Sequence, residues 1–180
     1  MKKYLVLALC LLILTVGHAQ NYTEYFANKT LRVDYIFTGD ASCQNVCLDE
    51  LSVLPSWAGR HQHLAELPLQ GNGQIIMKDL ESGKTIYTTS FSSLFQEWLE
   101  TDEAKAVTKG FENTFLLPYP LRPVEIEITL LSPRKEVRTH LTHTVRPDDI
   151  LIHQKGTAHI TPHKYLLKNG ETDKCIDVAI

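Results

Sequence analysis

Apolar and polar residues alternate along several short stretches of this 180-residue chain, a pattern typical of β-strands with one buried face. The clearest stretch reads LRVDYIFT at residues 31–38, where every second side chain is large and apolar before a Gly-Asp turn. Further strands are expected at residues 46–54, 74–80, 85–91, 124–130 and 137–145. The pattern therefore predicts a sheet-rich protein.

Two turns of hairpin length join neighbouring strands in this scheme. They read ESGK at residues 81–84 and SPRK at residues 132–135. The strands are expected to be antiparallel neighbours with one solvated face, and no long helix separates them. These features predict an all-β fold, an antiparallel β-sandwich or an open barrel-like pair of sheets. We take the sandwich as the expected fold.

Residues 92–109 depart from the alternating pattern and predict a short helical insertion. The letters FSSLFQEW at residues 91–98 place four large apolar side chains at i, i+3, i+4 and i+7, the spacing of a helical stripe. Ser93 and Gln96 have the spacing of a capping box, and TDE at residues 101–103 begins a second turn. We expect this aromatic stripe to cover the open end of a sheet rather than to bind a ligand.

The N-terminus has the features of a secretory signal peptide. Two lysines precede an apolar run at residues 4–16, and GHA at residues 17–19 fits the small-x-small cleavage pattern. The run is shorter than the roughly 20 residues that span a bilayer. We therefore expect a signal peptide at residues 1–19 and no membrane span. The mature protein is expected in the periplasm, at the cell surface or outside a Gram-negative bacterium.

Composition and charge describe an ordinary globular domain. The chain is 43% hydrophobic and 22% charged, with a formal net charge of −3. Its charges are scattered and give no basic surface of the kind that binds nucleic acid. We therefore expect no nucleic-acid partner.

An exported chain meets an oxidising compartment, so its cysteines are candidates for disulfides. Cys43 and Cys47 lie four residues apart, with an Asn between them that favours a turn. A small disulfide loop between them and two free thiols are alternatives that both stay open. Cys175 makes the number of cysteines in the mature chain odd, and no C-x-x-C pair is present.

Histidine is the only residue type with catalytic or metal-binding chemistry that is present in quantity. His61 and His63 lie in a segment with nearby Gly and Pro, which is expected to form a loop that fixes no ligand geometry. His140 and His143 are three residues apart on a predicted strand, so they face opposite sides and cannot share a metal. The chain has no H-E-x-x-H, G-x-S-x-G or G-x-x-x-x-G-K motif. We expect no catalytic and no metal-binding residue in it.

Five short stretches, taken in their order along the chain, form a pattern that can be compared with known protein families. They read YF at residues 25–26 with KTLRVDY at 29–35, PSWAG at 55–59, FSSLFQEW at 91–98, TDEAK at 101–105, and PYP at 118–120 before PV at 123–124. Over residues 22–147 the chain resembles the N-terminal domain of the IgA-peptidase family of secreted zinc metallopeptidases. The cysteine pair is not part of this resemblance, so a Cys43–Cys47 disulfide would be peculiar to this chain.

The resemblance implies a sandwich-like N-terminal domain followed by a catalytic domain with a zinc-binding H-E-x-x-H helix. The last residues, KCIDVAI at 174–180, resemble the first strand of that catalytic domain. We therefore expect a signal peptide (1–19), an accessory domain (20–153), a linker (154–169) and the start of a catalytic domain (170–180) that is otherwise absent. No zinc or catalytic residue of the family is carried over, so we expect no cofactor and no enzymatic activity in this chain.

The resemblance also suggests what the domain does. It is expected to support its own downstream catalytic domain, or to hold a protein substrate such as an immunoglobulin. A substrate-holding face would need an exposed aromatic patch, for which Trp57 and Tyr119 are the candidates, whereas a docking face would lie near the linker. The alternative function is a free-standing exported binding module for host proteins or glycans.

Overall fold

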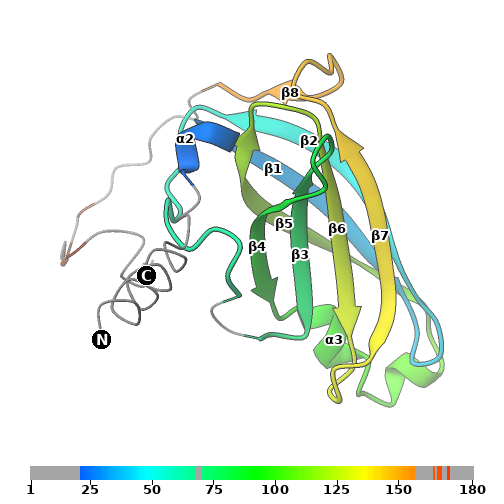
Figure 1. The fold of residues 1–180 in the computed structure, drawn as a ribbon. Coiled ribbons are helices and arrows are strands. Elements are labelled where there is room, and N and C mark those ends of the chain that lie inside the picture. The colour runs from blue at the N-terminus through cyan, green and yellow to red at the C-terminus, as the bar shows by residue number, and fades with distance from the viewer. Residues whose placement is uncertain (1–20, 68–69, 157–163, 165, 168–169, 171–180) are drawn as a thin grey trace, which may run out of the picture.

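The computed structural model of this protein contains two four-stranded sheets, and it describes residues 21–67, 70–156, 164, 166–167 and 170. The strand order is β5-β1-β2-β8 in the first sheet, called sheet A, and β4-β3-β6-β7 in the second, called sheet B. Figure 1 shows the sheets facing each other. The strands are β1 (Phe26–Gly39), β2 (Gln44–Leu54), β3 (Gly73–Asp79), β4 (Thr85–Phe91), β5 (Lys109–Pro120), β6 (Val124–Leu131), β7 (Val137–Val145) and β8 (His153–Gln154).

The pairing of the strands confirms the predicted antiparallel β-sandwich. Within the described residues every neighbouring pair is antiparallel except β2 and β8, which run parallel. Two short α-helices, α2 (Tyr22–Tyr25) and α3 (Leu94–Trp98), and one 3-10 turn, η1 (Glu103–Lys105), accompany the sheets. The fold is therefore all-β with a short helical insertion, as the alternation of the sequence predicts.

The core lies between the inner faces of the two sheets. Alternate residues of β1 point into it and have no exposed surface, namely Leu31, Val33, Tyr35 and Phe37. Sheet B contributes side chains that are equally buried, namely Ile75, Met77, Ile126 and Ile128. Burial of each such side chain stabilises the fold by roughly 1.5–3 kcal/mol relative to leaving it in water. The period-2 pattern of the sequence thus maps directly onto the core.

Two glycines allow the tight hairpins that connect the strands. Gly39 ends β1 with φ at 144°, and a Cβ at this position would lie 2.0 Å from the carbonyl oxygen of Cys43. Gly83 adopts φ of 68° in the predicted ESGK turn, and its N–H donates to the carbonyl of Asp79 at 2.8 Å. Gly39 requires glycine because a side chain would clash with the backbone, whereas the left-handed φ of Gly83 favours glycine without a clash.

The alternation does not predict β5, although this strand pairs with β1 along nearly its whole length. Two prolines, Pro118 and Pro120, make its sequence read as an irregular segment. Proline is tolerated because β5 is an edge strand of sheet A, where one side of the backbone needs no partner within the sheet. The strand still places Leu117 in the core with no exposed surface.

The predicted helical insertion closes one end of the sandwich. The Ser93 side chain caps α3 by accepting from the N–H of Gln96 at 3.3 Å, which confirms the predicted N-cap, while the Gln96 side chain accepts from the Ser93 hydroxyl at 3.0 Å. Phe95 is fully buried, and its ring centroid lies 6.1 Å from that of Phe37 and 5.5 Å from that of Phe111. The aromatic stripe therefore acts as a plug. Helical geometry is limited to α3 and η1 and is shorter than the predicted span.

Several of the expected segments fall on residues that the structure does not describe. These are the signal peptide at residues 1–19 and, apart from residue 170, the expected start of a catalytic domain at 170–180. The expected linker, 154–169, is described at residues 154–156, 164 and 166–167. Gln154 nevertheless belongs to β8, where it pairs with Val53. The hydrogen-bonded body therefore extends past residue 153.

Candidate functional site

The segment after β7, residues 146–155, is bound to sheet A, and we call it the strap. Its last part forms β8, where His153 lies opposite Ser52 on β2. The N–H of Lys155 donates to the carbonyl of Val53 at 3.0 Å, and Ile152 is only 4% exposed. Backbone pairing and a buried side chain thus determine the path of the chain as it leaves the sandwich (Figure 1).

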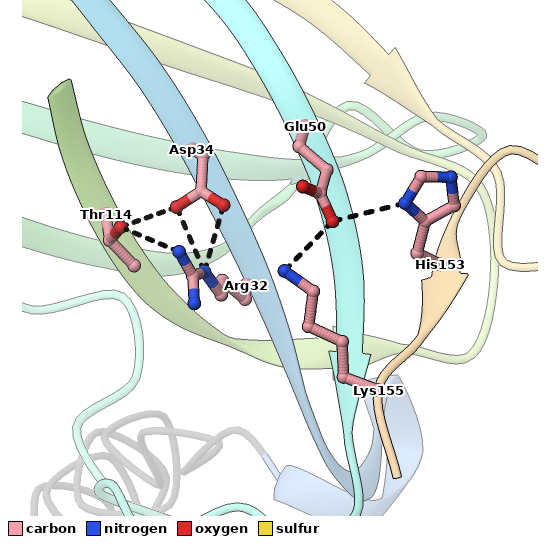
Figure 2. Close-up of polar contacts among 6 residues, drawn as sticks. All are labelled: Arg32, Asp34, Glu50, Thr114, His153 and Lys155. Atoms are coloured by element: carbon pink, nitrogen blue, oxygen red, sulfur yellow. Dashed lines mark hydrogen bonds and ion pairs between the residues drawn. The ribbon is translucent and has the colours of Figure 1, made fainter. Parts of the chain in front are cut away.

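Glu50 on β2 binds the Lys155 and His153 side chains at the end of the strap. Its Oε1 accepts from Nζ of Lys155 at 2.9 Å and lies 3.2 Å from Nδ1 of His153. Figure 2 shows the two side chains converging on this carboxylate from the strap. The hydrogen bonds from Lys155 and then His153 lower the pKa of Glu50. Glu50 therefore stays ionised at neutral pH and holds the strap by charge as well as by geometry.

A second group of polar contacts lies beside Glu50 on the outer face of sheet A. Nε of Arg32 donates to both carboxylate oxygens of Asp34, at 3.0 and 2.9 Å, and Thr114 on β5 donates to the same carboxylate (Figure 2). Burial alone would raise the pKa of Asp34, but the hydrogen bonds from Thr114 and Arg32 outweigh it. The positive charges of Arg32 and Lys155 also favour the ionised carboxylate, so the pKa of Asp34 is lowered.

The strand register explains why these two acidic groups are neighbours. Asp34 lies opposite Glu50 on one side and opposite Thr114 on the other. Two adjacent carboxylates repel each other unless cations lie close to both. The charge of Lys155 lowers the pKa of both carboxyls and so compensates this repulsion. Because their lowered pKa makes both carboxylates weak bases and both are paired, the arrangement suits the fixing of a chain segment better than proton transfer.

Tyr119, one of the two residues expected at an interaction surface, contacts the start of the strap. Its hydroxyl donates to the carbonyl of Pro147 at 2.7 Å. The side chain is half-buried, and burial followed by the charge of Asp148 raises the pKa of the phenol. Tyr119 thus anchors the strap from sheet A and lies near the expected linker.

Trp57, the other expected surface residue, lies in the core. It is 9% exposed, its ring packs edge-on against Tyr87 with centroids 6.1 Å apart, and its Nε1 donates to the carbonyl of Arg60 at 3.1 Å. A Cβ at Gly59 would lie 2.2 Å from Cζ2 of this ring. The expected exposed aromatic face at Trp57 is therefore not found, because the following residues fold over the indole.

Arg60 is a structurally important residue that the sequence analysis did not identify. Its guanidinium donates to the carbonyls of Leu64 at 3.1 Å, Glu66 at 3.0 Å and Thr88, and it lies 5.1 Å from the centroid of the Tyr87 ring. These contacts hold the loop after β2 across β4, the edge strand of sheet B. The position of Arg60 directly after the PSWAG stretch was the signal that could have pointed to it.

The two cysteines considered as a disulfide pair are both free and exposed. Cys43 immediately precedes β2, and Cys47 lies within this extended strand. Four residues of extended chain span about 13 Å, which exceeds the Cα separation of roughly 7 Å that a disulfide permits. The structure therefore shows two free thiols, because the chain does not turn between them.

The histidines are dispersed in the described part of the chain. His140 is exposed while His143 points inward, as the predicted alternation requires. His63 contacts Glu66, and the ring of His61 lies against Tyr22. Among the residues that the structure describes, no group of three or more His, Cys, Asp and Glu side chains is arranged to hold a metal ion. This part of the chain therefore does not fit the zinc of a metallopeptidase.

The comparison with protein families identifies the relatives of this sandwich. Residues 21–142 match the family model described as Peptidase M64 N-terminus. This chain belongs to the peptidase M64 family. The match covers the N-terminal region of these peptidases and confirms the resemblance to the N-terminal domain of the IgA-peptidase family. The comparison with curated proteins finds no match.

The stretches that carried the resemblance to the M64 family now have structural explanations. PSWAG forms the contact between Gly59 and the Trp57 ring, and FSSLFQEW forms the capped plug. The family match ends at residue 142, so the strap lies just beyond the matched region. No helix within the described ranges is both long and apolar enough to cross a bilayer.

Proposed function

We propose that this sandwich is a non-catalytic accessory domain of an exported M64 metallopeptidase and that it supports the catalytic domain of the same polypeptide. The observation that carries the proposal is the match of residues 21–142 to the N-terminal region of M64 peptidases. An N-terminal region that forms its own core behaves as a separate folding unit next to the domain that performs the chemistry.

The strap supports a role in positioning a neighbouring domain. Glu50, Tyr119 and the pairing of β8 with β2 hold the segment through which the polypeptide passes from the sandwich to the residues that follow. A fixed exit restricts where a following domain can lie, which favours docking over free movement on a linker.

The contacts of the aromatic residues favour support of the catalytic domain over binding of a protein substrate. Trp57 is buried, and the Tyr119 hydroxyl is occupied by the carbonyl of Pro147. Neither ring therefore provides the exposed aromatic face on which a substrate such as an immunoglobulin would be held. Zinc, under this proposal, belongs to the catalytic domain.

Export is part of the proposal and rests on the N-terminal pattern of two lysines, the apolar run at residues 4–16 and the GHA motif. Mass spectrometry of the mature protein from the native host tests it directly. We expect a chain that begins at Gln20, recovered from the periplasm, the cell surface or the medium. A cytoplasmic protein that retains residues 1–19 would contradict export.

The reading frame downstream of codon 180 provides the first test of the function. We expect it to encode a domain with an H-E-x-x-H motif, the metal-binding signature of a zinc peptidase. The supporting role is then tested by expressing this peptidase with and without residues 20–156 and measuring soluble yield, melting temperature and proteolytic activity. We expect the shortened enzyme to be less soluble and less active.

Two results would contradict the proposal in different ways. A gene without a peptidase domain would favour a free-standing binding module. A catalytic domain that keeps its full stability and activity without the sandwich would show that the sandwich does not support it.

A further inference from the structure

The strap holds two neighbouring aliphatic side chains in solvent. Ile150 is 94% exposed and Leu151 is 74% exposed, whereas the next residue, Ile152, is 4% exposed. Adjacent large aliphatic residues in water forgo the stabilisation that burial would provide. We infer that Ile150 and Leu151 form a docking tip for the domain that follows this one in the peptidase, an inference that rests on the proposed function.

The tip is held by contacts on both sides. Tyr119 binds the carbonyl of Pro147, and the Asp149 carboxylate accepts from the N–H of Leu151 at 2.9 Å. The N–H of Ile152 donates to the carbonyl of Asp149 at 3.2 Å, so a closed turn lies between the buried Ile152 side chain and β7. A preorganised apolar element loses little conformational freedom when a partner covers it, which favours binding.

The position of the tip argues for a partner on the same polypeptide. Gly156, the last residue of the continuously described body, comes five residues after Leu151, a reach of roughly 17 Å for extended chain. Residues 157–180 continue from there. A domain joined so close to the tip has an effective concentration on the order of millimolar, so a small apolar contact suffices to hold it.

Charges around the tip argue against a lipid surface as its partner. A membrane-binding apolar tip is typically surrounded by Lys and Arg, which attract anionic lipid. This loop instead carries Asp148 and Asp149 beside a single cation, Arg146. The apolar side chains therefore suit a protein surface better than an anionic bilayer.

The test compares the full-length peptidase with variants in which one apolar site is removed. The docking variant is Ile150→Ser with Leu151→Ser. The matched control is Leu94→Ser, a leucine that is 73% exposed on α3, at the opposite end of the sandwich from the loop before β8 (Figure 1). The measurement is the rate of trypsin cleavage after Lys164 and Lys168, in the expected linker.

We expect the docking variant to be cleaved roughly ten-fold faster than wild type, because cleavage tracks the population of the undocked state. Leu94→Ser should be cleaved at the wild-type rate. In the 180-residue chain, where the tip is uncovered, wild type, the docking variant and Leu94→Ser should melt at the same temperature. Equal melting temperatures show that the substitutions leave the sandwich folded.

Several results would overturn the inference. Equal cleavage of the docking variant and wild type would show that the tip does not hold the following domain, while the proposed accessory function would stand. A gene without a catalytic domain would remove the proposed function and the inference with it. Sedimentation of the 180-residue chain with phosphatidylglycerol vesicles, or its dimerisation in ultracentrifugation, would identify a membrane or a second copy as the partner if the docking variant abolished it.

Discussion

The hydroxyl of Tyr35 lies 2.7 Å from Nε2 of His143 and joins the two sheets across the core. Tyr35 on β1 is completely buried, and the two rings meet edge-on with centroids 5.7 Å apart. Burial lowers the pKa of His143 to about 4 and raises the pKa of Tyr35. The tyrosine therefore keeps its proton and donates a hydrogen bond to Nε2 of the neutral imidazole.

This pair predicts that the sandwich loses stability in mild acid. The pKa of His143 in the folded state, about 4, lies below its value of 6.5 in an unfolded chain. Between these pH values the unfolded chain binds a proton that the folded chain excludes, so the free energy of unfolding falls as pH drops from 6.5 towards 4. The loss reaches at most about 3 kcal/mol. Urea unfolding at pH 7 and pH 4.5 measures it.

Variants at the two histidines of β7 separate this effect from the titration of carboxylates. His143→Gln keeps an acceptor for Tyr35 but does not titrate, so its stability should fall less between pH 7 and pH 4.5 than that of wild type. His140→Gln alters an exposed side chain on the same strand and should retain the wild-type pH dependence. If His143→Gln and wild type respond identically to acid, the neutral state of His143 contributes nothing measurable.

Gly59 should tolerate no side chain. Gly59→Ala would place a Cβ 2.2 Å from Cζ2 of Trp57, so the indole must move within a packed core, at a cost of about 1–3 kcal/mol of unfolding free energy. Gly110→Ala is the matched control, because its Cβ would meet only Ile36, at 3.6 Å. Thermal unfolding followed by near-UV circular dichroism checks both. Equal melting temperatures for the two variants would disprove this account of the PSWAG stretch.

Gln96 should contribute to stability through the hydrogen bonds of its amide. Its Nε2 donates to the carbonyl of Leu131 at 3.0 Å and to that of Asn72, which joins the plug to the ends of two strands. Gln96→Ala would leave these part-buried carbonyls without the amide donor, and we expect a loss of about 2 kcal/mol in denaturant unfolding. Glu97→Ala, an exposed change on the same helix, should cost much less. A similar loss for both would show that the amide hydrogen bonds of Gln96 make no specific contribution.

The Glu50 contacts should hold the strap locally. Glu50→Gln removes the charge that attracts Lys155 and weakens the carboxylate contact with His153, so we expect faster amide hydrogen exchange at residues 153–155 with little change in the melting temperature. Glu112→Gln, an exposed change on β5 of the same sheet, serves as the control. Unchanged exchange in Glu50→Gln would show that backbone pairing alone holds β8. Because the pKa of Glu50 is lowered, wild type should retain the contact at neutral pH and lose it only in acid.

Strands with one apolar and one polar face could be recognised from the amino-acid sequence alone. The alternation at residues 31–38 identified the buried face of β1, and the capping-box spacing of Ser93 and Gln96 identified the start of the plug. Both are local signals, since the residues that define them lie within a few positions of one another. The stretches resembling M64 peptidases pointed to the family in the same way.

Tertiary structure alone decided the features that depend on residues far apart in the chain. β5 is a strand because β1 pairs with it, despite its prolines, and Trp57 is buried because Arg60 and its loop fold across β4. The strap contacts likewise join Glu50 to side chains about a hundred positions away. The local pattern of apolar and polar residues shows which face of a segment is buried. It does not show which distant segment covers that face, because this depends on the packing of the whole domain.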